Sequence, residues 1–164
     1  MIWKGIWSFI LGLFFLYLQI LVLPAFALFS VIPNILLPWL IYTVWSRPRD
    51  LALIVVFIIG LMFDSVNPMT FGLYAFVFCL LVLAINEFRK PFETESFVAK
   101  MLTIGIVNLL FSVIQLLVFG VTFSFAGLLL TKSLLGFGYN ILLSIIVFWG
   151  LQLLSKVRLS ISND

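Results

Sequence analysis

The sequence predicts an all-α fold: a polytopic membrane protein, built as a bundle of six transmembrane helices with both termini in the cytoplasm. The first observation behind this prediction is composition. Of 164 residues, 65% are hydrophobic and 9% are charged, and the mean hydropathy is +1.33, whereas a soluble domain has about 25% charged residues. The second observation is the arrangement of apolar runs, which alternate with short segments that carry the cations. We expect a single transmembrane domain over residues 1–164.

The first apolar run predicts a span over residues 6–29. Lys4 precedes this run, and Ala25-Phe26-Ala27 has the small-x-small form of a signal peptidase site. The uninterrupted apolar stretch 5–23 is longer than the roughly 7 to 15 residues of a signal h-region. We therefore expect this segment to be a retained first span.

Five further apolar runs follow. They predict spans over residues 33–45, 51–64, 71–88, 97–119 and 132–154. The second and third spans are near or below the usual minimum of about 17 residues, and Pro33 and Pro38 lie in the second. Such segments fit helices that end below the membrane surface, or broken segments shielded by neighbouring helices.

The cations test this count independently. With the N-terminus inside, eight of the nine cations lie on the cytoplasmic side, namely Lys4, Arg47, Arg49, Arg89, Lys90, Lys100, Lys156 and Arg158. Only Lys132, at the start of the last span, lies outside, in agreement with the positive-inside rule. The pI of about 9.2 therefore reflects topology, and we expect no nucleic-acid partner.

Groups that could carry chemistry are scarce. The chain has no His and a single cysteine, Cys79, and it contains no glycine-rich phosphate loop. We therefore expect no enzyme, and no catalytic, cofactor-binding or metal-ligating residues. Three acids, Glu87, Glu93 and Glu95, accompany cations in one inner connection, which is either a solvated loop with local ion pairs or a docking surface.

Polar residues within the spans predict helix contacts. Gln19, Asn108, Gln115, Asn140 and Gln152 can each hydrogen-bond a neighbouring helix. Asn108 and Gln115 share a helix face, which lines either the bundle interior or a contact with another protein's helix. Small residues at Ser8 and Gly12, and at Gly136, Asn140 and Ser144, permit close helix approach. The tryptophans Trp3, Trp7, Trp39, Trp45 and Trp149 are expected in interfacial aromatic belts.

Asp64 is the one acid at the outer end of an apolar run. The charge map places it at the outer membrane boundary, where an ionised carboxylate costs little, and so we expect it not to be buried. Gly60, one turn earlier, admits a close neighbour, and Pro68 and Gly72 bracket the next helix entry. Three interpretations are open: a cap that joins two helices together with Ser65 and Asn67, an ion or proton relay, or a tight turn that a partner recognises.

These residues carry a family resemblance. Two segments of the chain resemble the rod-shape-determining protein family MreD. The first is Pro33-Asn34, which opens an aliphatic and aromatic run to Trp45. The second is Gly60-Leu61-x-x-Asp64, followed by Pro68 and by Gly72-Leu73-Tyr74-Ala75. The resemblance implies a non-enzymatic component of the bacterial inner membrane that belongs to the cell-elongation complex. It further implies a partner in the single-span helix of MreC, and through it MreB, the glycosyltransferase RodA and a class B penicillin-binding transpeptidase.

The same resemblance implies an architecture similar to the substrate-binding subunits of energy-coupling-factor transporters. Such a vitamin-binding subunit is our alternative function. It would need a polar pocket near the outer surface, whereas a scaffold would need an apolar groove for a partner helix. As structural or partner-binding residues we select Pro33, Asn34, Gly60, Asp64, Pro68, Gly72, Asn108 and Gln115.

Overall fold

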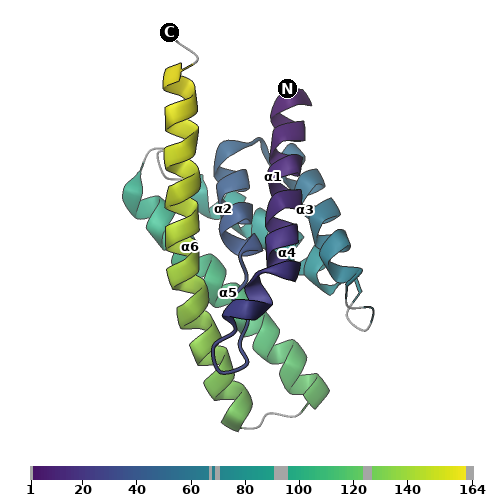
Figure 1. Cartoon of the computed structure of the whole chain (residues 1–164). Helices are drawn as coiled ribbons and strands as arrows, with labels where there is room; N and C mark the ends of the chain where they lie inside the picture. The colour runs from purple at the N-terminus through teal and green to yellow at the C-terminus, as the bar shows by residue number, and fades with distance from the viewer. Residues whose placement is uncertain (1, 67, 69–70, 91–95, 124–126, 162–164) are drawn as a thin grey trace.

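The structure, a computed structural model, describes residues 2–66, 68, 71–90, 96–123 and 127–161. These residues form six α-helices and one short 3-10 helix. The elements are α1 (Ile2–Leu21), η1 (Leu23–Phe26), α2 (Leu36–Ser46), α3 (Arg49–Asp64), α4 (Leu73–Arg89), α5 (Phe97–Phe123) and α6 (Gly127–Ile161). The expected all-α class is confirmed. Helix α1 begins and α6 ends at the same end of the bundle (Figure 1).

The helices differ widely in length. Two of them, over Phe97–Val121 and Gly127–Ser155, are long and apolar enough to cross a membrane. Helix α2 has only 11 residues, so it is about 16 Å long and spans roughly half of a 30 Å hydrocarbon core. Six complete crossings therefore stay a prediction, as does the expectation that the second and third helices end below the membrane surface.

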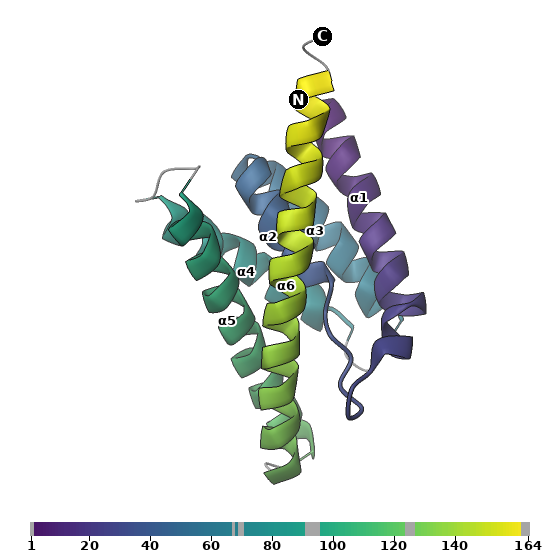
Figure 2. The ribbon, with the colours of Figure 1, turned by 60° about the vertical axis from the view of Figure 1, so that its left-hand side comes forward.

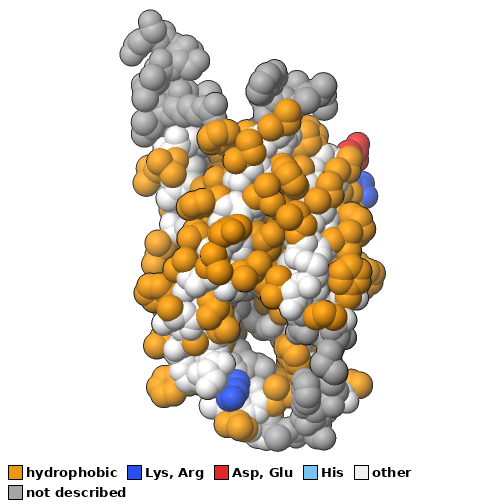
Figure 3. Space-filling model, turned by 45° about the vertical axis from the view of Figure 1, so that its right-hand side comes forward, with side chains coloured by type: hydrophobic (Ala, Val, Ile, Leu, Met, Phe, Trp, Pro, Cys, Tyr) orange, Lys and Arg blue, Asp and Glu red, His pale blue; other side chains and the backbone are white. Residues whose placement is uncertain are grey.

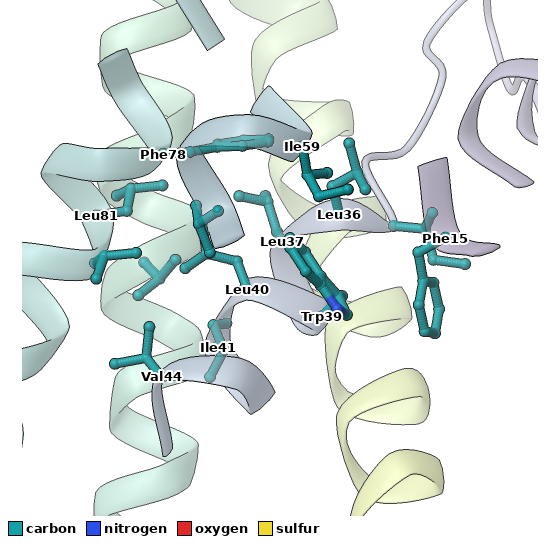
Figure 4. Close-up of a cluster of buried hydrophobic side chains, with 14 of the residues drawn as sticks. Phe15, Leu36, Leu37, Trp39, Leu40, Ile41, Val44, Ile59, Phe78 and Leu81 are labelled. Atoms are coloured by element: carbon teal, nitrogen blue, oxygen red, sulfur yellow. The ribbon is translucent and has the colours of Figure 1, made fainter. Parts of the chain in front are cut away.

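Helix α2 lies at the centre of the bundle. It contacts α1, α3, α4, α5 and α6, and nearly all of its side chains are buried. Figure 4 shows Trp39 and Leu40 of α2 among side chains such as Phe15 of α1 and Phe78 of α4. The expectation that Trp39 belongs to an interfacial belt is wrong, because the helix that carries it is surrounded on all sides by other helices.

The first span ends earlier than expected. Helix α1 stops at Leu21 and gives way to η1, in which Pro24 occupies one of the first two positions. Proline lacks the N–H that continues an α-helix and clashes with the preceding turn. The chain then makes a narrow loop in which Leu28 and Val31 pair through their backbones, and this loop leads to the start of α2.

The outside of the bundle is hydrophobic. Figure 3 shows apolar side chains over most of the described surface on one face, and Figure 2 shows α5 and α6 converging toward the end opposite the chain termini. Large side chains such as Phe14 and Tyr17 on α1 and Leu142 and Ile146 on α6 are exposed. This apolar outer surface suits a lipid environment.

Candidate functional site

Asp64 is the last residue of α3, and its carboxylate caps the start of α4. One oxygen accepts a hydrogen bond from the amide of Tyr74 at 3.0 Å, and the other accepts from the amide of Ala75 at 2.9 Å. Both amides lie in the first turn of α4, where helix N–H groups have no partner within the helix. The residue at the N-cap position, Gly72, has no side chain that could do this.

The side chain of Asp64 is only 1% exposed. Our expectation that it is not a buried charge is therefore wrong. Two amide donors and the positive end of the α4 dipole compensate the buried carboxylate. These contacts support the capping interpretation, in which the cap crosses from one helix to the next. Asn67, the other expected participant, lies outside the described residues.

Gly60 and Gly72 shape the same junction. A Cβ atom added to Gly60 would lie 2.6 Å from the Cα atom of Ala75, so α3 and α4 touch backbone to backbone at this point. The expected close neighbour of Gly60 is thus α4 of the same chain. Gly72 has φ +90°, a left-handed conformation that glycine adopts without strain. Pro68 is exposed in the turn between the two helices.

The start of α2 is held by a second set of cross-helix contacts. Gln19 of α1 donates to the carbonyl of Pro33 at 3.1 Å and accepts from the amide of Ile35 at 2.8 Å. Asn140 of α6 accepts from the amide of Asn34 at 2.7 Å. The first N–H groups of a helix have no partner within the helix, and these side chains supply partners at the start of α2.

The other end of α2 is held in the same way. Arg89, the last residue of α4, donates to the carbonyl of Val44 in the final turn of α2. The sequence analysis placed Arg89 in the hydrophilic inner connection. Its hydrogen bond to the end of α2 was not predicted, because it depends on the packing of α4 beside α2. Within that connection the local pair of Lys90 and Glu87 is confirmed at 2.5 Å, whereas Glu93 and Glu95 lie outside the described residues.

Asn108 joins α5 to α6. Its side-chain amide is fully buried, donates to Ser144 at 3.1 Å and accepts from the same hydroxyl at 3.3 Å. Asn108 therefore lines the bundle interior, one of the two alternatives that its helix face left open. The expected helix contacts of Gln19, Asn108 and Asn140 are confirmed, but Gln152 Oε1 is buried without a hydrogen-bond partner among the described residues.

Gln115 lies two turns further along α5, beside a cavity. Its side-chain nitrogen is 3.5 Å from the hydroxyl of Tyr74, and the cavity has a volume of about 700 Å³. The cavity lies between α5, α6 and the segment that joins α1 to α2, on the side that the charge distribution assigns to the cell exterior. Sequence reasoning named Gln115 but gave no signal for the cavity, which depends on how α5 and α6 are spaced.

No described residues form a group of three or more His, Cys, Asp or Glu side chains that could hold a metal ion. The chosen residues instead form three structural clusters: the α3–α4 junction with Gly60, Asp64 and Gly72, the start of α2 with Pro33 and Asn34, and the α5 face with Asn108 and Gln115. Each cluster fixes one helix against another.

Comparison with known proteins gives one match. The family model for the rod shape-determining protein MreD matches residues 1–156. No curated protein and no solved structure matches the chain significantly, so the expected similarity to energy-coupling-factor subunits stays a prediction and the transporter alternative gains no support. MreD proteins are membrane proteins associated with the MreB and MreC shape machinery, and they are not a known enzyme family. Because the match spans nearly the whole chain, this protein belongs to the MreD family of rod shape-determining membrane proteins.

Proposed function

We propose that this protein is a non-enzymatic scaffold of the bacterial cell-elongation complex, inserted as a multi-pass protein in the inner membrane. It holds the single-span helix of MreC, and through MreC it couples the MreB cytoskeleton to the peptidoglycan synthases, RodA and a class B penicillin-binding transpeptidase. Family membership supports the general role. The polar groups of the interior support a rigid framework, because they connect helices to one another.

The observation that carries the partner proposal is a row of residues on the outer face of α6. Gly138, Leu142, Ile146 and Gly150 follow one another at intervals of four, so they share one helix face. Leu142 and Ile146 are 64% and 70% exposed. A Cβ atom added to either glycine would meet no atom within 4 Å, so the row has open space at both ends.

Glycine in a helix interior costs about 1 kcal/mol relative to alanine. The bundle already uses Gly12 and Gly60 for close contacts, since an added Cβ there would lie 2.5 Å from Trp39 and 2.6 Å from Ala75. Gly138 and Gly150 have no such contact within the described chain. Small residues on a membrane helix allow another helix to approach closely, so we assign this row to the MreC span.

The test is copurification of MreC with variants of this chain. Gly138→Leu and Gly150→Leu fill the row and are expected to reduce the MreC recovered by about tenfold, the equivalent of about 1.4 kcal/mol. Gly105→Leu on α5 is the matched control, because Gly105 is also a helical glycine with open space around an added Cβ atom. Its recovery of MreC should equal that of the unchanged chain.

Two outcomes contradict the proposal. Full recovery of MreC with both α6 variants places the partner elsewhere, and equal losses with Gly105→Leu show a general effect of a bulky residue. In cells that depend on this chain for their shape, the α6 variants should produce round cells at normal protein levels. Rod-shaped cells with the double variant would argue against a coupling role for this face.

A further inference from the structure

The cavity of about 700 Å³ has no part in the scaffold role proposed above. Its volume lies within the range of about 300–1,000 Å³ that is usual for ligand pockets. It extends along α6 from Asn140 to Leu128, twelve residues that correspond to about 18 Å of helix. The cavity is therefore long enough for an extended molecule that lies parallel to the helices.

Side-chain oxygens at the inner end of the cavity hold the start of α2 in place. Gln19, Asn34 and Asn140 line this end, and their side-chain oxygens accept hydrogen bonds from backbone amides at the start of α2. These oxygens are therefore engaged by the backbone of the protein itself. Aromatic side chains such as Phe63, Phe111, Phe119 and Phe137 complete the lining. These aromatic rings form an apolar wall that suits a hydrocarbon chain.

Further polar side chains line the cavity on α5 and α6. Lys132 and Ser133 come from α6, and Ser112 and Gln115 come from α5. Lys132 is half-buried, and no Asp or Glu occurs in the described lining. Since Lys132 is the only Lys or Arg in that lining, it gives the cavity a single positive charge beside hydroxyl and amide donors.

We propose that this cavity binds an amphiphile with one anionic headgroup, whose headgroup contacts Lys132, Ser133 and Gln115 and whose hydrocarbon chain lies along the aromatic wall. An ammonium with neighbouring neutral donors recognises a phosphate or carboxylate through charge-assisted hydrogen bonds. An anionic phospholipid of the outer leaflet and a free fatty acid share this chemistry, and the experiment below separates them.

The experiment uses the purified full chain in detergent and measures bound lipid by native mass spectrometry. The probes are dioleoyl phosphatidylglycerol, dioleoyl phosphatidylcholine and oleate, each added at equal concentration. We expect retention of phosphatidylglycerol above that of phosphatidylcholine. Lys132→Gln should lower this retention about tenfold, the loss of one charge-assisted contact. Lys90→Gln, which removes an exposed lysine at the opposite end of the bundle, should leave it unchanged.

A second pair of variants tests the cavity itself. Ser112→Phe places a ring in the cavity and should abolish retention, whereas Val113→Phe adds the same ring to the exposed face of α5 and should not. Gel filtration and circular dichroism confirm that each variant is folded. If the chain retains oleate but not phosphatidylglycerol, and Lys132→Gln lowers the retention of oleate, the ligand is a free fatty acid. This result also supports a site for an anionic amphiphile.

The proposal is overturned if the folded Lys132→Gln and Ser112→Phe variants retain as much of each anionic probe as the unchanged chain, because the lipid then sits on the general surface. It is also overturned if phosphatidylcholine binds as well as both anionic probes. A polypeptide that occupies the cavity in place of lipid, seen as a Ser112→Phe-sensitive protein adduct, would refute it as well.

Discussion

Replacing Asp64 by alanine removes both acceptors that hold the first turn of α4. The amides of Tyr74 and Ala75 lose partners at 3.0 and 2.9 Å in a site where the Asp64 side chain is 1% exposed. A buried amide left without a partner costs about 1–3 kcal/mol. For two amides we expect Asp64→Ala to lower the free energy of unfolding by about 3 kcal/mol.

The asparagine variant removes the charge and one of the two acceptors. Asp64→Asn keeps one oxygen acceptor but loses the charge that interacts with the α4 dipole, so we expect a loss of about 1–1.5 kcal/mol. Ser65→Ala is the control, because the Ser65 hydroxyl is exposed and bonds only to the carbonyl of Met62 in its own helix. Its effect should be within about 0.5 kcal/mol of zero.

The assay is reversible unfolding in mixed micelles with increasing SDS, followed by circular dichroism. Hydrogen exchange of the Tyr74 and Ala75 amides gives a local readout, and both should exchange faster in Asp64→Ala. The reasoning is refuted if Asp64→Ala matches Ser65→Ala in stability. If Asp64→Asn is as unstable as Asp64→Ala, one remaining oxygen acceptor is not enough to hold the first turn of α4.

Three further predictions use the same unfolding assay. Gly60→Ala forces a Cβ atom to 2.6 Å from the α4 backbone and should destabilise the fold by about 2 kcal/mol, whereas Gly105→Ala, in open space, should leave stability equal or higher; equal effects would show that the contact is not tight. Gly72→Ala places a side chain at φ +90° and should cost about 1–2 kcal/mol through backbone strain alone, so a neutral result contradicts that conformation. A double-mutant cycle of Asn108→Ala and Ser144→Ala should give a coupling free energy of about 0.6–1.7 kcal/mol, and additive effects would mean that the two side chains do not interact.

Hydropathy and charge placement predicted the all-α class and the approximate positions of the helices, because the length of an apolar run and its flanking cations are local properties. The helix-contact roles of Gln19, Asn108 and Asn140 were also predicted, since a polar side chain in an apolar helix needs a partner. Their partners were not predicted. Asn34 and Asn140 are 106 positions apart, and such a pairing depends on how complete helices pack.

The errors have the same origin. Asp64 was expected not to be buried because the charge map places it at the membrane boundary, but the return of the chain at Gly72 brings the start of α4 over its carboxylate. Trp39 was expected in an aromatic belt because tryptophan favours the membrane interface, but α2 is short and central. Both cases depend on where a helix lies within the bundle. The hydrophobic pattern of that helix alone does not predict its position.

The central position of α2 has a consequence for biosynthesis. An 11-residue helix is too short to enter the bilayer as an independent crossing. Asn140, which accepts from the amide of Asn34 just before this helix, belongs to α6, which the ribosome makes after the other five described helices. Until α6 is complete, the amide of Asn34 lacks this acceptor, and the nascent chain exposes an unsatisfied polar group at membrane depth. Chains truncated before α6 should therefore be substrates for membrane proteases, so that only complete chains accumulate.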